Sequence, residues 1–400
     1  MTSRSRVVVV GASIGGATAA ETLRREGFDG EIILIGDERH RPYQRPPLSK
    51  QILLGEWEPD EAAIHTVAQS EELGIDVRTS CTATGLDVEA HTVRTSQGDV
   101  RYDELIIATG SEPRPHPLLP MALTLRTMDD ALALRDGLRS ARRVGVIGAG
   151  VLGSEIASAA RKYGADTLLV GRSAALTFGG VGALLSARLI RLHEDHGVEL
   201  ALGAEIAGSE VAHGGTELQF ADGRREFVDL LVAMIGATPR TGWLESSTLA
   251  ITDGVVCDRV GRAAPGVSAV GDVAAWENPF TGRPSRVEHQ SNAIEQAVAV
   301  ALRLTHGELG SAPVPLFWSE IHGARIHAYG WFDQERPLVT ADAGAANAES
   351  ADAGPAGKAA VLLSRDSADR VRGAVGWNAA PREFRTARAA VLAAPELTPS

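Results

Sequence analysis

The sequence has little cysteine, few aromatic residues and no long apolar run. Its two cysteines, Cys81 and Cys257, lie far apart and form no CxxC motif, and aromatic residues make up only 4% of the 400 residues. This cysteine usage argues against a disulfide framework and against a cysteine-ligated zinc or iron–sulfur site, and we expect no metal site. No segment supplies about 18 uninterrupted apolar residues, so we expect no transmembrane helix.

Positive charge is also scarce, because 39 Lys and Arg stand against 51 Asp and Glu for a formal net charge of −12. An acidic surface repels nucleic acid and anionic membranes, so we expect neither as a partner, although a local basic patch for an acidic partner remains compatible with this charge. The basic start, the apolar Val7–Val10 and the small residues Ala17–Ala20 imitate a signal peptide. Gly11, Gly15 and Gly16 interrupt that pattern, and cleavage would remove the loop they build, so we expect a cytoplasmic protein.

Short apolar runs alternate with helical patterns through most of the chain. We predict helices over Gly16–Gly27 and Gly153–Gly164, because each segment has the length of a helix and ends at a glycine. The apolar runs suit parallel strands covered on both faces: Val7–Val10, Ile32–Ile35, Leu105–Ala108, Val144–Ile147, Thr167–Val170 and Leu230–Ile235. The pattern predicts an α/β protein with two Rossmann-like dinucleotide-binding domains.

The character of the chain changes after about Gly310. Residues 314–332 and 359–377 contain aromatic residues and valines suited to an antiparallel sheet. Between them, Ala341–Gly357 is dominated by Ala, Gly, Asp and Asn, which indicates a mobile hairpin connection. With a helix expected over Arg382–Ala394, this region predicts a C-terminal α+β domain.

The first glycine loop is Gly11-Ala12-Ser13-Ile14-Gly15-Gly16, directly after a strand. A tight turn there brings the backbone close to a pyrophosphate, and the following helix offers free N–H groups to its anionic oxygens. Ser13 stands at the usual middle glycine, which weakens the fingerprint and leaves a simple tight turn as the alternative. Asp37 closes the second strand, where it can accept a hydrogen bond from a ribose hydroxyl. Strand, helix and acid together favour a dinucleotide site.

The second loop, Gly148-Ala149-Gly150-Val151-Leu152-Gly153, is a complete fingerprint. The strand that follows ends at Gly171-Arg172, where an NAD-binding domain normally has Asp or Glu. Loss of that carboxylate removes a ribose acceptor, and Arg172 can pair with a 2′-phosphate. The residues therefore favour NADPH, with NADH open, because Arg172 as an ordinary surface arginine is the alternative. Two dinucleotide sites in one chain indicate a flavin–nicotinamide enzyme, in which the flavin accepts a hydride and releases electrons singly.

The segment His40-Arg41-Pro42-Tyr43-Gln44-Arg45-Pro46-Pro47-Leu48-Ser49-Lys50 resembles the flavin-side motif of the FAD-dependent ferredoxin reductases, such as the putidaredoxin and rhodocoxin reductases. Those enzymes reduce small iron–sulfur proteins that serve cytochromes P450 and ring-hydroxylating dioxygenases. Further marks of the family follow in order along almost the entire chain: Ala108-Thr109-Gly110, Gly236-Ala237-Thr238-Pro239, Val270-Gly271-Asp272-Val273, Glu288-His289, Asn292-Ala293-Ile294-Glu295-Gln296, Phe317-Trp318-Ser319 and Val375-Gly376-Trp377-Asn378.

The resemblance implies a glutathione reductase-like fold. Residues 1–112 and 237–312 would form a split FAD-binding domain, residues 113–236 the NAD(P)-binding domain, and residues 313–400 the C-terminal domain. The implied cofactors are FAD with NADPH or NADH, and the implied partner is an iron–sulfur ferredoxin. The protein would be a monomer or a homodimer.

The resemblance also implies roles for single residues. Lys50 would lie near flavin N5 and stabilise negative charge on the reduced ring, Glu155 would approach the nicotinamide carboxamide, and Trp318 would lie beside the isoalloxazine. Asp272 would bind the ribityl chain. The rest of the FAD site would comprise Gly11, Ser13, Gly15, Gly16, Asp37, Arg45, Ala83, Arg126 and Gln290, and the nicotinamide site Gly148, Gly150, Val151, Leu152, Gly153, Arg172 and Gly236.

Two departures from the family lie near the flavin. Gln290 stands where the family usually has an apolar or aromatic residue, and Glu320-Ile321-His322 replaces an acid–Gln–aromatic run. His322 is either a proton-carrying group or an isolated structural histidine. The leading interpretation is a ferredoxin reductase. The alternatives are an FAD enzyme that reduces oxygen, a quinone or a small biosynthetic intermediate, and a redox sensor of apoptosis-inducing-factor type. A disulfide reductase is disfavoured because Pro42–Lys50 contains no cysteine.

Overall fold

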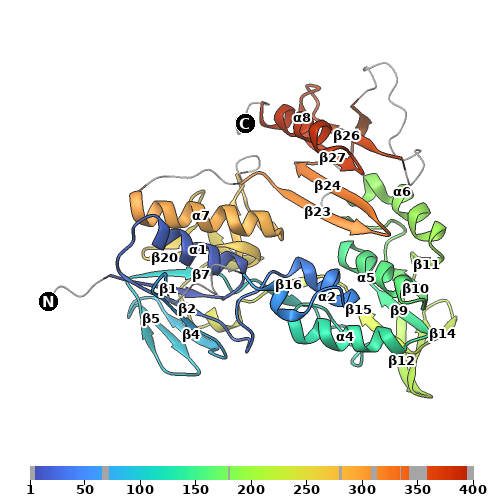
Figure 1. The fold of residues 1–400 in the computed structure, drawn as a ribbon, viewed down its shortest axis with the longest axis horizontal. Coiled ribbons are helices and arrows are strands. Elements are labelled where there is room, and N and C mark those ends of the chain that lie inside the picture. The colour runs from blue at the N-terminus through green and yellow to red at the C-terminus, as the bar shows by residue number, and fades with distance from the viewer. Residues whose placement is uncertain are drawn as a thin grey trace.

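The computed structural model describes residues 5–64, 72–178, 181–278, 282–307, 313–333, 335–341 and 358–393. Figure 1 shows two sheet-and-helix units at the two ends of the long axis and a third sheet that lies over the second unit. The predicted α/β fold with a C-terminal α+β region is confirmed. Within the described residues, no helix is both long enough and apolar enough to cross a membrane.

The N-terminal unit is built on a six-stranded sheet of order β19-β20-β7-β1-β2-β3. Its central strands are buried and pair in parallel, as expected for strands covered on both faces. Helix α1 (Ile14–Arg25) packs against α7 (Gln290–His306), so the two ends of this unit come from distant parts of the chain. The strands are β1 (Arg6–Val10), β2 (Glu31–Ile35), β3 (Ile75–Arg78), β7 (Glu104–Ile107), β19 (Arg262–Ala264) and β20 (Val267–Ala269).

The second unit repeats this design with a four-stranded parallel sheet of order β11-β10-β9-β15. Its strands are β9 (Arg143–Ile147), β10 (Asp166–Gly171), β11 (Val198–Leu202) and β15 (Leu230–Ala233), and its helices are α4 (Met128–Ser140), α5 (Val151–Lys162) and α6 (Gly182–Asp195). The predicted elements exist, with boundaries moved by one or two residues. For example, α1 begins at Ile14 rather than Gly16, because the N-terminal turn of the helix is part of the glycine loop.

Each unit also carries a three-stranded antiparallel meander. The meanders are β4 (Ala83–Asp87), β5 (Thr92–Thr95) and β6 (Val100–Arg101) in the first unit, and β12 (Ile206–Ala212), β13 (Gly215–Phe220) and β14 (Arg225–Val228) in the second.

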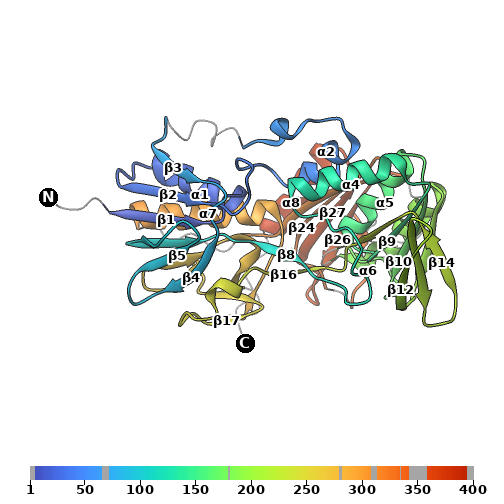
Figure 2. The same ribbon diagram turned by 90° about the horizontal axis from the view of Figure 1, so that it is seen from below.

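The chain passes between the units through two short antiparallel strands, β8 (Ser111–Pro113) and β16 (Ala237–Pro239). Figure 2 shows this pair in the middle of the molecule, between the two units. The outgoing and returning segments are therefore held together at the point where one unit meets the other.

The predicted antiparallel C-terminal sheet is present, and it has five strands in the order β23-β24-β27-β26-β25. They are β23 (Leu316–Ile321), β24 (Ala324–Gly330), β25 (Val339–Thr340), β26 (Ala360–Arg365) and β27 (Val371–Trp377), and helix α8 (Pro381–Leu392) packs on β27. Most of the expected hairpin connection, residues 342–357, lies outside the described residues.

Smaller elements complete the N-terminal unit, and some of them pack against the second unit and the C-terminal sheet. The 3-10 turn η1 (Pro46–Ser49) and helix α2 (Gln51–Leu54) belong to one buried apolar cluster with α4, α5, α6 and the C-terminal sheet. The others are η2 (Pro59–Ala62), β17 (Ile251–Thr252), β18 (Gly254–Cys257), η3 (Gly242–Leu244), η4 (Gly271–Val273), β21 (Ala274–Glu277) and β22 (Pro284–Ser285). The segment that carries Lys50 is thus anchored against the second unit and the C-terminal sheet.

Candidate functional site

The two glycine loops have the same backbone geometry. Gly11 and Gly148 have φ of +116° and +112°, and a Cβ on either would lie 2.1 or 2.0 Å from a backbone carbonyl oxygen. A Cβ on Gly16 or Gly153 would lie 1.9 Å from the carbonyl oxygen of Gly11 or Gly148, respectively. Only glycine fits at these four positions, and each loop aims a helix N-terminus at the space beyond the parallel strands. This is the geometry in which a dinucleotide pyrophosphate binds.

The middle position of the loops does not require glycine. Ser13 and Gly150 both precede their helix with ordinary φ values of −104° and −95°. A Cβ on Gly150 would lie 3.5 Å from its nearest neighbour, Thr177 Oγ1, and one on Gly15 would lie 3.7 Å from its nearest neighbour, Ala293 Cβ. Ser13 therefore leaves the turn intact, although it weakens the sequence fingerprint.

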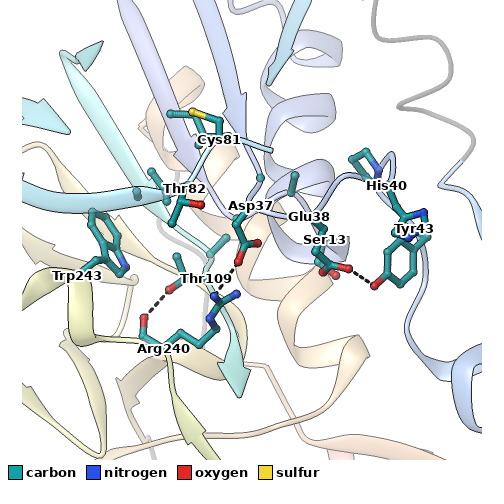
Figure 3. A pocket seen from close by; sticks show the side chains of 18 of the residues that line it. Ser13, Asp37, Glu38, His40, Tyr43, Cys81, Thr82, Thr109, Arg240 and Trp243 are labelled. Carbon is teal, nitrogen blue, oxygen red and sulfur yellow. Dashed lines mark hydrogen bonds and ion pairs between the residues drawn. The ribbon is translucent and has the colours of Figure 1, made fainter. Parts of the chain in front are cut away.

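A cavity runs past the first loop and brings several predicted FAD-site residues together. Figure 3 shows Ser13 and Asp37 in its middle, Tyr43 and His40 at one end, and Trp243 at the other. Of the predicted residues, it is lined by Gly11, Ser13, Asp37, Arg45 and Ala83, and it also includes Glu38, His40, Tyr43, Cys81, Thr82, Thr109, Arg240 and Trp243.

Two arginines converge on this site. Arg45 Nη2 lies 2.8 Å from Glu38 Oε1, Arg45 Nη1 donates to the carbonyl oxygen of Arg126, and Arg126 Nη2 lies 3.0 Å from Asp272 Oδ2. Burial, followed by the charge of Arg45, lowers the pKa of Arg126. The Nε atoms of both arginines are buried and have no hydrogen-bond partner among the described residues. Paired guanidinium groups with unused donors suit an anionic pyrophosphate.

Asp272 lies in η4, which packs against α7. Its Oδ2 also accepts a hydrogen bond from Ser111 Oγ at 3.1 Å, and the preceding Gly271 N donates to Gln296 Oε1 at 2.8 Å. Gln290 is the half-buried first residue of α7. The structure thus brings Asp272 and Arg126 into contact and places Gln290 on the adjoining helix.

His289 precedes α7 and is not a predicted site residue, although it belongs to the Glu288-His289 motif shared with the ferredoxin reductases. Its ring centroid lies 4.9 Å from that of Phe317, and its buried Nδ1 has no partner among the described residues. Burial lowers the pKa of His289 to about 4, against the opposing charge of Asp272. The ring is therefore neutral near pH 7 and can offer a hydrogen bond to a bound molecule.

Of the predicted residues, Lys50 contacts both Glu155 and Trp318. Lys50 Nζ lies 2.8 Å from Glu155 Oε1 and 5.0 Å from the centre of the Trp318 ring. The side chain of Glu155 is 5% exposed and that of Lys50 14%, whereas Trp318 is 45% exposed. A buried ion pair thus lies next to an aromatic ring that reaches the surface.

Two serines complete this cluster. Ser49 Oγ donates to Glu155 Oε2 and Ser319 Oγ to Glu155 Oε1, each at 2.5 Å. Neither serine was predicted as a site residue, although each adjoins a predicted residue within a quoted motif. Three donors from two separate elements hold the Glu155 carboxylate, which comes from a third.

Comparison with known proteins now decides the family. A family model described as pyridine nucleotide-disulphide oxidoreductase matches residues 5–297. The chain belongs to that family. The "Chlorobenzene dioxygenase, ferredoxin reductase component" of Cupriavidus sp. (strain PS12) is 36% identical over 99% of this chain and 94% of the relative. The "Benzene 1,2-dioxygenase system ferredoxin--NAD(+) reductase subunit" of Pseudomonas putida is 33% identical over 98% and 94%. Among solved structures, the covalent putidaredoxin reductase–putidaredoxin complex matches with a TM-score of 0.86 at 27% identity, covering 97% and 93%.

The disulphide in the family name has no counterpart at the Lys50–Glu155 pair of this oxidoreductase. Both cysteines, Cys81 and Cys257, are buried and free, and burial raises the pKa of Cys257 to about 12. Reduction of a disulphide by a flavin needs a thiol beside the ring. The resemblance to the ferredoxin reductases is confirmed by the relatives instead.

The residues present fit FAD, the group that the family resemblance implies. The first loop and the unused donors of Arg45 and Arg126 suit the pyrophosphate, and Asp37 suits the ribose. Bound FAD supplies a ring that accepts a hydride and releases electrons singly. Beside such a ring, Lys50 would offer a positive charge, and Glu155 would hold its ammonium in place.

In the second unit of this oxidoreductase, a residue of opposite charge stands at the position that corresponds to Asp37. Gly36 and Gly171 end corresponding strands, and a Cβ on either would lie 2.7 or 2.8 Å from the Cβ of the alanine in its glycine loop. Asp37 follows the first and Arg172 the second, so the two residues are equivalent. Arg172 is exposed and makes no hydrogen bond or ion pair within the described part of the chain.

The remaining predicted residues of the second site lie around the same loop. Val151 and Leu152 open helix α5, and Gly236, with φ of +100°, precedes β16. Across the described residues, no three or more His, Cys, Asp and Glu side chains are placed to hold a metal ion.

His322 is not isolated. Its Nε2 lies 3.0 Å from Nδ1 of the buried His193, and its ring stacks on that of His196 with centroids 4.2 Å apart. The backbone N–H of His322 donates to Ser158 Oγ on α5 at 2.8 Å. It therefore belongs to a three-histidine cluster between α6 and the C-terminal sheet.

Proposed function

We propose that this oxidoreductase is the ferredoxin reductase component of an oxygenase system. It takes a hydride from a nicotinamide coenzyme onto FAD and passes single electrons to an iron–sulfur ferredoxin. The observation that carries the proposal is the buried Lys50–Glu155 pair, which joins the η1 segment to the helix that follows the second dinucleotide loop and lies beside the half-exposed Trp318. Relatives over almost the whole chain carry ferredoxin reductase names.

The same proposal assigns the roles. Residues 1–112 and 237–312 bind FAD, residues 113–236 bind the coenzyme and residues 313–400 complete the site. Lys50, Glu155 and Trp318 act at the reacting rings. The FAD contacts are Gly11, Ser13, Gly15, Gly16, Asp37, Arg45, Ala83, Arg126, Asp272 and Gln290, and the coenzyme contacts are Gly148, Gly150, Val151, Leu152, Gly153, Arg172 and Gly236.

The test is electron transfer with the purified yellow protein. NADH or NADPH is mixed with it anaerobically, and cytochrome c reduction is then followed with and without a [2Fe–2S] ferredoxin. We expect rapid bleaching of the flavin and turnover that depends on ferredoxin. Bleaching without such turnover would reject the proposal and favour oxygen, a quinone or a small intermediate as acceptor. Very slow bleaching by both coenzymes would favour a redox sensor of apoptosis-inducing-factor type.

The choice of coenzyme depends on Arg172. The relatives' names print NAD(+), whereas the arginine at the position equivalent to Asp37 favours a 2′-phosphate, so we propose that NADPH is accepted at least as well as NADH. Arg172→Asp should lower the ratio of kcat/KM for NADPH to that for NADH by about 10-fold or more, since a charge-assisted hydrogen bond is lost and repulsion is added. Arg94→Asp, which makes the same charge change at an exposed position on β5, is the matched control. Equal ratios in both variants would exclude contact between Arg172 and the phosphate.

A further inference from the structure

Arg240 lies in the segment that follows the second unit in the sequence. Its side chain contacts Asp37, the carboxylate proposed to bind ribose in the first site. Arg240 follows β16, and its backbone is held against the turn after β7: Arg240 N donates to the carbonyl oxygen of Gly110 at 3.0 Å, and Thr109 Oγ1 donates to the carbonyl oxygen of Arg240 at 2.9 Å. Its Nη2 lies 2.7 Å from Asp37 Oδ2 (Figure 3). Two backbone-directed contacts therefore fix where this guanidinium enters the cavity.

The ion pair leaves Asp37 able to bind a sugar. Only Oδ2 accepts from Arg240, and Oδ1 has no hydrogen-bond partner among the described residues. One oxygen thus anchors the carboxylate, while the other is free to accept from a hydroxyl. The guanidinium also offsets the negative charges of Asp37 and Glu38 beside the place where a pyrophosphate would approach.

Trp243, three residues further on in η3, lines the same cavity. Its indole Nε1 is buried and has no hydrogen-bond partner among the described residues. A buried donor without a partner is costly, so its presence at the wall of a cavity indicates that an acceptor from a bound molecule satisfies it.

The order of the binding groups along the cavity indicates which part of a bound dinucleotide accepts the hydrogen bond from Trp243 Nε1. The glycine loop marks the pyrophosphate and Asp37 marks the ribose, and a nucleoside carries its base on the opposite side of the ribose from its phosphate. Figure 3 shows Trp243 and Thr82 on the side of Asp37 away from Tyr43 and His40. The end occupied by Trp243 is therefore the end at which the base lies.

We propose that Arg240 and Trp243 form the adenosine-binding end of the FAD site, Arg240 by anchoring Asp37 over the ribose and Trp243 by donating to the adenine. The proposal rests on the FAD site of the proposed function and adds two binding residues to it. Because both come from the segment that returns after the nicotinamide unit, FAD is held by both halves of the split domain.

The test compares probes that contain or lack adenosine. Starting from the holoenzyme, the dissociation constant of FAD is measured from the fluorescence of released flavin on dilution, and inhibition constants of ADP and FMN are obtained by displacement of FAD. In Arg240→Ala, we expect the constants for FAD and ADP to rise together by about 10-fold, with that for FMN changed less than twofold. Arg240→Lys, which keeps the charge, should recover part of the loss. Trp243→Phe, which keeps a ring but removes the donor, should weaken FAD and ADP by about threefold to tenfold.

Two variants serve as controls. Arg259→Ala breaks a comparable exposed ion pair, Arg259 Nε to Glu277 Oε1 at 2.8 Å, and Trp57→Phe alters a tryptophan in a different apolar cluster. Unchanged FAD and ADP binding in Arg240→Ala and Trp243→Phe would overturn the proposal, and so would a loss of FMN binding equal to the loss of ADP binding. These constants are measured without an electron acceptor, so they remain interpretable even if the wild-type enzyme fails to reduce ferredoxin.

Discussion

At the scale of single residues, Glu155 holds together the side chains of the proposed reacting centre. Its carboxylate receives Lys50, Ser49 and Ser319, so its two oxygens are shared by donors from two other parts of the fold. A buried charge is stable only when it is paired and hydrogen-bonded, and here each member of the cluster depends on the others.

Glu155→Gln should therefore slow the chemistry as well as weaken the fold. It removes the charge that pairs with the largely buried Lys50, so we expect the anaerobic rate of flavin reduction by coenzyme to fall by about 10-fold or more. The free energy of unfolding should fall by about 2 kcal/mol, because the ammonium loses its counter-charge. Stopped-flow reduction and urea unfolding measure the two effects. Glu277→Gln, which breaks an exposed pair, should change neither by a comparable amount.

Much of this centre could be predicted residue by residue. Lys50, Glu155 and Trp318 were each expected from motifs, and the structure places all three in one cluster. The serines were missed because a hydroxyl in a motif has no pattern of its own, and its importance depends on which carboxylate it meets. The sequence leaves open whether His322 is an isolated structural histidine, because its partners His193 and His196 lie far away in the sequence, at the end of α6.

At the scale of elements, each glycine loop depends on how closely a helix approaches a strand. Gly16 and Gly15 are neighbours on α1, but a Cβ would lie 1.9 Å from a carbonyl oxygen at Gly16 and no closer than 3.7 Å to any atom at Gly15. Of these two neighbours, only Gly16 must be glycine for the helix to approach the loop this closely.

Gly16→Ala and Gly15→Ala should consequently differ. We expect Gly16→Ala to lose about 3 kcal/mol of unfolding free energy, because α1 must move away from β1. Gly15→Ala should stay within about 1 kcal/mol of the wild type, since the added methyl group meets ordinary contacts and alanine favours a helix. Thermal unfolding followed by circular dichroism measures both. Equal melting temperatures would show that the loop relaxes at little cost.

At the scale of the whole molecule, the histidine cluster joins the second unit to the C-terminal sheet. Burial lowers the pKa of His193 to about 4 and that of His322 to about 3, with further lowering of the His322 pKa by His193, His196, Arg161 and Lys162. The interface is therefore built for neutral imidazoles.

This arrangement makes stability depend on pH. The folded-state pKa values lie below the ordinary value of about 6.5, so the unfolded chain binds more protons between the two. The free energy of unfolding should be highest above pH 6.5 and should fall as the pH drops from 6.5 towards 4. His193 alone should lower it by up to about 1 kcal/mol per pH unit. Urea unfolding at several pH values should show a smaller slope in His193→Gln. His213→Asn, at an exposed turn with φ of +48°, should keep the wild-type slope, and a slope unchanged in both variants would contradict this account.

The sequence by itself determined the repeated strand–loop–helix units, the antiparallel C-terminal sheet and the resemblance to the ferredoxin reductases. These features could be predicted because they depend on the periodicity of apolar residues, on the positions of glycines and on the order of the motifs, all of which can be read from the sequence. Only the tertiary structure decided that Ser49 and Ser319 hold Glu155, that Arg240 reaches Asp37 and that three histidines gather between α6 and the C-terminal sheet. Each of these contacts joins residues that the chain keeps far apart, and no local pattern states which distant side chains will meet.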